Sequence, residues 1–178
     1  MKKKIWIWII CIAIIVISVF KIITGFILYP YLKPPTNWTV KYEYKQDISP
    51  DIEDKLLLWT KSLYDFYESE RASSNRFDVE KTSSIISLSN NLLKDLEERK
   101  ENREISFTEN KLANEISDAS WKIVEIVAYR EINNKAKASI LNGTQKHDIQ
   151  KINSRKKQIV KNKLNFHKDV KHFLNYFE

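Results

Sequence analysis

Apolar side chains recur with the same spacing in two separate segments of this 178-residue chain. The intervals alternate between four and three residues, which places these side chains along one face of an α-helix. The first set is Ile52, Leu56, Trp59, Leu63 and Phe66, and the second is Leu112, Ile116, Ala119, Ile123 and Ile126. The whole chain contains only two glycines, so little in it interrupts helical structure. We therefore expect an all-α fold.

Helix start signals divide residues 50–178 into a domain of about four helices. Ser49 followed by Pro50 is typical of a helix start, and Ser106 with Glu109 has the pattern of a capping box. The expected helices span residues 50–70, 76–103, 107–142 and 145–176. Because the connections between them are short, we expect an antiparallel bundle.

An apolar segment near the amino terminus predicts a transmembrane helix over residues 5–29. Ile5 to Leu28 would form roughly 36 Å of helix, which is long enough to cross a bilayer with some tilt. Its one charged residue, Lys21, would lie near the far interface, where a long side chain can reach the headgroups. Aromatic residues typical of the two interfaces are placed at both ends. The predicted membrane anchor residues are Trp6, Trp8, Lys21 and Tyr29.

Residues 1–4 form a basic tail, which predicts an uncleaved signal anchor with the amino terminus in the cytoplasm. The apolar run lacks the small-residue pattern of a signal-peptide cleavage site. The domain that follows would then lie outside the cytoplasm, at the inner membrane of a bacterium. Heavy use of isoleucine, lysine and asparagine agrees with an AT-rich bacterial or phage genome.

Residues 30–49 are expected to form a stalk followed by one short extended or β segment. Three prolines favour extended backbone at the start of this stretch. Four residues then alternate with polar ones, as in a strand, although no second run of this kind exists to pair with them. These residues are Trp38, Val40, Tyr42 and Tyr44. They would either contact a partner protein, through a free strand edge and aromatic side chains, or close one end of the bundle.

Charge is divided unevenly along the helical domain. Residues 50–118 carry 10 basic and 16 acidic side chains, whereas residues 144–178 carry 9 basic and 3 acidic ones. One interpretation pairs the basic last helix with the acidic first two helices of the bundle. The other directs its lysines toward an acidic protein or anionic lipid. The lysines named for this second role are Lys156, Lys157, Lys161 and Lys168.

No pattern in the chain is typical of a catalytic, cofactor-binding or metal-binding site. Two glycines cannot build a phosphate-binding loop, and a single cysteine cannot build a cysteine-based zinc site. His167 and His172 are five residues apart, which turns them onto different faces of a helix. We expect no catalytic centre, no cofactor and no metal, and hence no enzyme. Nucleic acid is not an expected partner, because no nucleic-acid-binding module is recognisable.

These features predict a single-pass, membrane-anchored helical binding module. It would tether, assemble or inhibit another cell-envelope protein, in contact with the membrane and with anionic lipid as a further partner. Homo-oligomers are compatible with the same pattern. The alternative is a phage- or plasmid-type immunity, superinfection-exclusion or lysis-related envelope protein.

Overall fold

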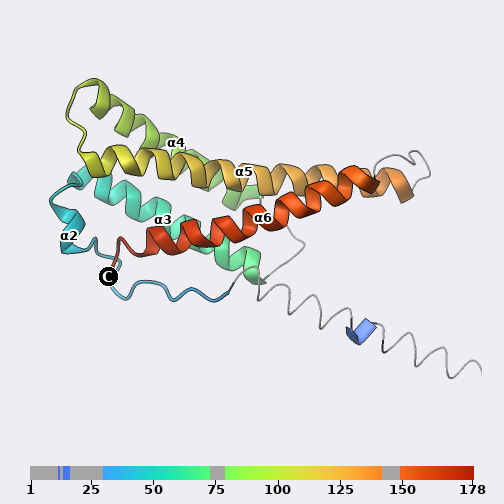
Figure 1. Ribbon diagram of the computed structural model, residues 1–178. Coiled ribbons are helices and arrows are strands. Elements are labelled where there is room, and N and C mark those ends of the chain that lie inside the picture. Colours follow the sequence, from blue (N-terminus) through green and yellow to red (C-terminus); the bar gives the residue numbers. More distant parts are fainter. Residues whose placement is uncertain (1–11, 13, 17–29, 73–78, 142–148) are drawn as a thin grey trace, which may run out of the picture.

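The described part of the chain is mostly helical, which confirms the all-α fold class (Figure 1). The computed structural model describes residues 12, 14–16, 30–72, 79–141 and 149–178. From residue 30 onward its helices are α2 (Tyr42–Lys45), α3 (Pro50–Ala72), α4 (Val79–Glu101), α5 (Phe107–Leu141) and α6 (Ile149–Leu174). The bounds of the four long helices lie within a few residues of those expected from the sequence.

The four long helices form a bundle. Helices that follow one another in the sequence pack side by side, and α6 packs back against α3 to complete the ring. Figure 1 shows that neighbouring helices run in opposite directions. The predicted helical bundle is therefore confirmed.

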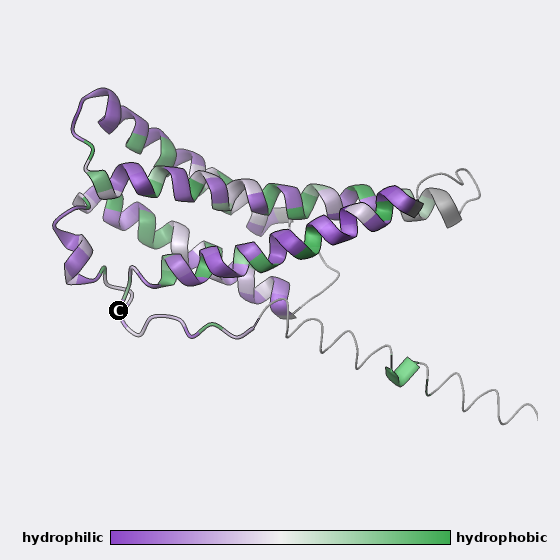
Figure 2. Cartoon of the chain, in the orientation of Figure 1, coloured by the Kyte–Doolittle hydropathy of each residue, from purple (hydrophilic) through white to green (hydrophobic). Residues whose placement is uncertain are grey.

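The two apolar seams expected from the sequence make the core of the bundle. All ten of their side chains are at most 1 % exposed. The main contributions of α4 and α6 are Ile85, Leu92, Leu96, Phe166, Val170 and Phe173. Near the middle of α3, Trp59 donates its indole N–H to Ser89 Oγ at 2.7 Å. Figure 2 shows hydrophobic residues on the helix faces turned toward one another and hydrophilic residues on the outer faces.

Ser106 and Glu109 form the predicted capping box at the start of α5. The Glu109 backbone N–H donates to Ser106 Oγ, and the Ser106 N–H donates to Glu109 Oε2, both at 3.0 Å. The same carboxylate accepts hydrogen bonds from the backbone N–H and the hydroxyl of Ser49, at 2.9 and 2.7 Å. Glu109 therefore links the starts of α3 and α5.

The expectation of one extended segment through residue 45 is wrong beyond Lys41. Residues 42–45 form the short helix α2, in which the N–H groups of Tyr44 and Lys45 donate to the Lys41 carbonyl. Trp38 has a φ of 53°, in the left-handed region, which also interrupts the strand geometry. The chain has to reverse direction here to enter α3, and a helical turn makes that reversal.

The extended part of this segment does have a pairing partner in the chain, contrary to the sequence-based expectation. Val40 forms an antiparallel bridge with Phe177. The N–H groups of Asn37 and Trp38 donate to the Glu178 carbonyl, and that of Lys41 donates to the Tyr176 carbonyl. The expected free strand edge is therefore taken up by the chain's own last residues.

The proline-containing stretch lies against the bundle instead of standing apart from it as a stalk. The hydroxyls of Tyr67 and Tyr64 on α3 donate to the carbonyls of Pro30 and Leu32, at 2.5 and 3.1 Å. The Leu32 side chain is buried. The chain therefore reaches the bundle directly at Pro30.

No helix among the described residues is long and apolar enough to cross a membrane. The predicted anchor, residues 5–29, falls mostly outside these residues, and so do Trp6, Trp8, Lys21 and Tyr29. Within it, the structure describes only Ile12 and residues 14–16, which are helical and exposed.

Candidate interaction surfaces

Three of the four alternating residues in the 38–44 segment pack against the bundle. The Trp38 ring lies 6.2 Å from the Tyr64 ring and 5.8 Å from the Phe177 ring, centroid to centroid. Val40 is buried, and the Tyr44 ring lies 4.5 Å from the ring of Tyr176. Only the side chain of Tyr42 faces solvent, at 75 % exposed. The contacts favour the interpretation in which this segment closes one end of the bundle.

We expect Tyr44→Ser to lower the free energy of unfolding by about 1–2 kcal/mol, because it removes a packed aromatic pair and its buried area. Tyr42→Ser should change that free energy by less than about 0.5 kcal/mol, since its side chain is exposed. Urea denaturation of the detergent-solubilised chain, followed by circular dichroism, measures both. Equal destabilisation by the two substitutions would contradict the assignment of Tyr44 to the bundle's own packing.

The four lysines named on the last helix all project from α6 into solvent. Within the described part of the chain, none of them forms an ion pair. The ion pairs of α6 use other residues: Lys163 with Glu70, Asp169 with Lys122, and His172 with Glu115. Among the described residues, the ion-pair contact of α6 with the acidic first helix is thus made by Lys163 and Glu70, and Lys156, Lys157, Lys161 and Lys168 remain candidates for the second interpretation.

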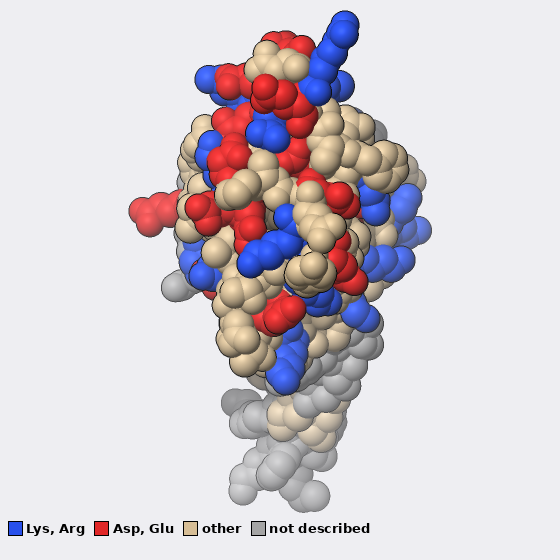
Figure 3. Space-filling model, turned by 90° about the vertical axis from the view of Figure 1, so that its left-hand side faces the viewer, with Lys and Arg blue, Asp and Glu red and all other residues tan. Residues whose placement is uncertain are grey.

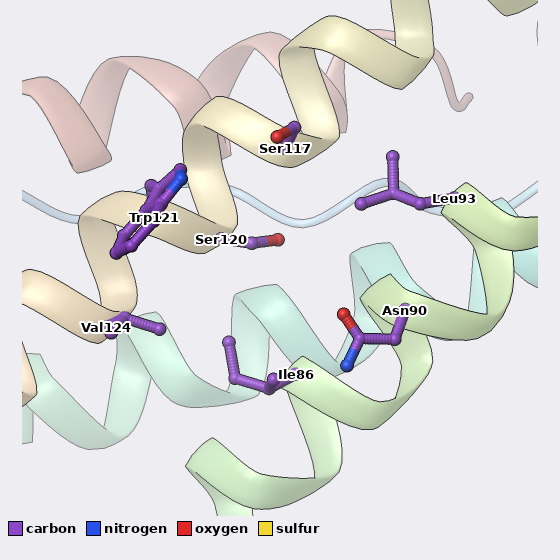
Figure 4. Close-up of a pocket in the computed structure, with 7 residues that line it drawn as sticks. All are labelled: Ile86, Asn90, Leu93, Ser117, Ser120, Trp121 and Val124. Atoms are coloured by element: carbon purple, nitrogen blue, oxygen red, sulfur yellow. The ribbon is translucent and has the colours of Figure 1, made fainter. Parts of the chain in front are cut away.

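A groove between α4 and α5 is a further surface that the sequence reasoning missed (Figure 4). It has a volume of about 240 Å³. Its lining residues are Ile86, Asn90, Leu93, Ser117, Ser120, Trp121 and Val124. The indole of Trp121 stands at one side of the groove and is 65 % exposed. The sequence carries one signal for this surface. Trp121 follows the buried Ala119 by two residues, and this spacing places Trp121 on the outer face of α5.

Hydrogen bonds link α4 to α5 at the floor of the groove. Ser120 Oγ donates to the Ile116 carbonyl at 2.7 Å and lies 2.8 Å from Ser89 Oγ. Ser89 in turn accepts the indole N–H of the buried Trp59. The bond between Ser120 and Ser89 joins α5 to α4, and the bond from Trp59 joins α4 to α3, so the groove lies over a hydrogen-bonded contact of three helices.

A second hollow, of about 260 Å³, lies between α5 and α6 and is lined mostly by charged groups. Its lining residues are Glu115, Asp118, Lys168, Asp169, His172 and Phe173. Lys122 bridges two of these carboxylates, at 2.8 Å from Asp169 and 3.2 Å from Asp118. Burial raises the pKa of Asp169, and the hydrogen bond from Lys122 works against that rise. Among the described residues, no group of three or more potential ligands is arranged to hold a metal ion.

His167, His172 and the clustered acids contribute to ion pairs and hydrogen bonds of the helices. His167 Nδ1 lies 2.7 Å from the Tyr67 hydroxyl, whereas His147 falls outside the described residues. Residues 97–104 mix acidic and basic side chains, with ion pairs such as Lys94 to Glu98. Figure 3 shows charges of both signs mixed over this end of the bundle. It is an exposed polar surface.

A buried cluster of charges joins three helices. The guanidinium of Arg130 on α5 forms two hydrogen bonds with the carboxylate of Glu70 on α3, at 2.7 and 2.5 Å. Lys163 Nζ on α6 lies 3.8 Å from the same carboxylate. Burial and the nearby Arg130 lower the pKa of Lys163 to about 8, although Glu70 works against that fall. These contacts link α3, α5 and α6 through one buried carboxylate.

No protein-family model, curated protein or solved structure matches the chain. Two surfaces remain as candidates for binding: the α4–α5 groove edged by Trp121 and the exposed lysines of α6.

Proposed function

We propose that this protein is a membrane-anchored helical binding module whose α4–α5 groove binds another protein of the cell envelope. The observation that carries the proposal is the exposed Trp121 beside a largely apolar groove. Among the described tryptophans, only Trp121 is exposed. Tryptophan is one of the residue types most enriched at the energetic centres of protein interfaces.

The size and chemistry of the groove favour a protein partner. About 240 Å³ lies below the usual range of small-molecule pockets, which is roughly 300–1,000 Å³. A single large apolar side chain from a partner fits a hollow of this size. The lining has no charged residue, and the amide of Asn90 and the hydroxyl of Ser117 supply polar groups. We therefore infer a partner segment with an exposed apolar or aromatic anchor residue.

Support for the membrane anchor comes from the sequence. Residues 5–28 are apolar apart from a few residues, and they follow a tail with three lysines. In this proposal the chain crosses the bacterial inner membrane once, with its amino terminus in the cytoplasm and the bundle outside. The bundle binds and holds its partner beside the membrane and carries out no catalysis.

Trp121→Ser should weaken partner binding roughly 30-fold, because a central interface tryptophan contributes about 2 kcal/mol or more. The measurement is photo-crosslinking in cells from an unnatural residue placed at Asn90 in the groove, followed by purification from membranes. The matched control is Leu58→Ser, which removes an exposed apolar side chain from α3, on the opposite side of the ring. Crosslinking that survives Trp121→Ser, or that falls equally in both variants, would contradict the proposal.

A further inference from the structure

The chain joins the bundle at a fixed point between α3 and α6. The Pro30 carbonyl accepts a hydrogen bond from the Tyr67 hydroxyl, and that hydroxyl lies 2.7 Å from His167 Nδ1. The guanidinium of Arg71 lies 5.3 Å from the centre of the Tyr31 ring. These contacts hold the start of the described chain at the level of Tyr67 and His167.

This entry point lies partway along the molecule and not at one end of it. The pair of Glu70 and Arg130 places the last turns of α3 beside residue 130 of α5. From Phe107 to Arg130, α5 extends roughly 35 Å in one direction. In the other direction, α6 extends roughly 27 Å from His167 back to Ile149. Figure 1 shows this second part of α5 and α6 projecting beyond the described ends of α3 and α4. We call residues 131–141 and 149–162 the arm.

The apolar run of the predicted transmembrane helix ends at Leu28, two residues before Pro30. Two residues reach at most roughly 7 Å, so Pro30 would lie at the level of the headgroups. The headgroup layer is only roughly 5–8 Å thick on each side of the hydrocarbon core. With its long axis upright, the bundle would push either the arm or its opposite end into hydrocarbon. An orientation with the long axis along the membrane surface keeps both ends out of the hydrocarbon.

The side of α6 that faces the entry point is basic and partly aliphatic. Counting back from His167 by helical turns places Val160 and Lys156 on the same face, with Leu164 and Lys157 beside it. The exposed Lys161 lies at the edge of this face, next to Lys157. Leu164 and Val160 are each 42 % exposed, and both lysines are exposed. Residues 149–168 contain seven lysines and arginines and no acidic residue. Lysines beside exposed aliphatic groups are typical of helices that lie in a membrane interface.

We propose that the bundle lies lengthwise on the membrane that anchors it, with Lys156, Lys157, Lys161, Val160 and Leu164 of α6 against anionic lipid headgroups. This inference rests on the membrane anchor of the proposed function and adds a second contact to it. The lysines bind lipid phosphates, and the two aliphatic side chains enter the outer edge of the acyl region. The contact fixes which sides of the bundle a partner can reach.

The test uses the full chain in bilayers, with Cys11→Ser and a single fluorophore attached at Asn153→Cys. Asn153 is exposed and lies on the same side of the arm as Val160. Bilayers contain a lipid-linked quencher, with or without phosphatidylglycerol in phosphatidylcholine. We expect strong quenching in the phosphatidylglycerol bilayers and a marked loss at high salt, because salt screens the lysines. A fluorophore at Asn91→Cys on α4, across the ring from α6, should stay unquenched throughout.

In the phosphatidylglycerol bilayers, the bundle is in equilibrium between states with α6 on and off the lipid surface. The triple variant K156Q/K157Q/K161Q should lower the ratio of the bound to the unbound state roughly 100-fold, since each lysine near an anionic surface contributes about fivefold. The matched control K94Q/K100Q/K111Q removes three exposed lysines from α4 and α5 and should leave the quenching unchanged. Extraction with alkaline carbonate tests the anchor separately, because an unanchored chain would leave the membrane. A carbonate-resistant chain whose Asn153 fluorophore is unquenched in anionic bilayers would overturn the inference. So would equal loss of quenching in both triple variants, or lysines that instead crosslink to an acidic protein.

Discussion

Replacing Glu70 by alanine is expected to lower the free energy of unfolding by about 3–5 kcal/mol. The carboxylate is 4 % exposed and is the shared partner of Arg130 and Lys163. Its removal leaves two cationic side chains with little access to water and without this carboxylate. Removing one partner of a buried ion pair is strongly destabilising because the remaining charge is no longer compensated. Urea denaturation of the detergent-solubilised chain, followed by circular dichroism, measures the change.

Glu68→Ala is the matched control on the same helix. Glu68 pairs with Arg71, and both side chains are 28 % exposed, so this loss should cost less than about 1 kcal/mol. A triple variant that replaces Glu70, Arg130 and Lys163 by leucine or methionine should recover much of the stability lost in Glu70→Ala, because it leaves no buried charge. Similar destabilisation by Glu70→Ala and Glu68→Ala would show that the buried cluster is not a strong cross-link.

The lowered pKa of Lys163 makes the free energy of unfolding depend on pH. Its pKa is about 8 in the folded chain and near 10.5 when unfolded, so between these values the unfolded chain binds the additional proton. Stability should therefore rise with pH across this window, because the cost of burying a charged lysine disappears there. Below pH 8 both states are protonated and this contribution to stability is at its lowest. Lys163→Met should lack the rise, whereas the control Lys168→Met should keep it.

Replacing Glu109 by alanine should lower the free energy of unfolding by roughly 2–4 kcal/mol. The carboxylate is 1 % exposed and accepts hydrogen bonds from Ser49 and Ser106 at two helix starts. Arg99 Nε also lies 3.4 Å from it. Its loss leaves these donors without their acceptor and separates the start of α3 from that of α5. The same urea titration measures the change, with the exposed Glu104→Ala as control.

Protonation of the Glu109 carboxylate at low pH should lower the free energy of unfolding, as Glu109→Ala does. Burial by itself raises the pKa of Glu109, but the hydrogen bonds from Ser106 and Ser49 and the charge of Arg99 hold it below its ordinary value of 4.5. The carboxylate therefore adds stability that is fully present above pH 4.5 and is lost as the pH falls through the lowered pKa. Glu109→Gln should remove that part of the acid dependence. An unchanged acid profile in Glu109→Gln would contradict the linking role of this residue.

The sequence by itself determined the four long helices, their order and the centre of the core. Repeated four-and-three spacing identifies the buried face of a helix without tertiary information, and all ten seam residues of α3 and α5 are buried. The helix starts at Pro50 and Phe107 were also predictable, because capping depends on residues within one turn of each other. These features are local or periodic along the chain, which is why a single sequence carries them.

Only the tertiary structure decided what the remaining residues do, because their roles depend on partners far away in the chain. Alternation predicted an extended run through Tyr44, but contacts with residues 176–178 and the reversal into α3 set its conformation. The capping box predicted one role for Glu109, and its second role depends on Ser49, 60 residues away. The groove at Trp121 and the position of the α6 lysines relative to Pro30 likewise exist only once four helices pack together. Side-chain spacing along a helix shows which face is apolar, and only packing shows which faces remain uncovered.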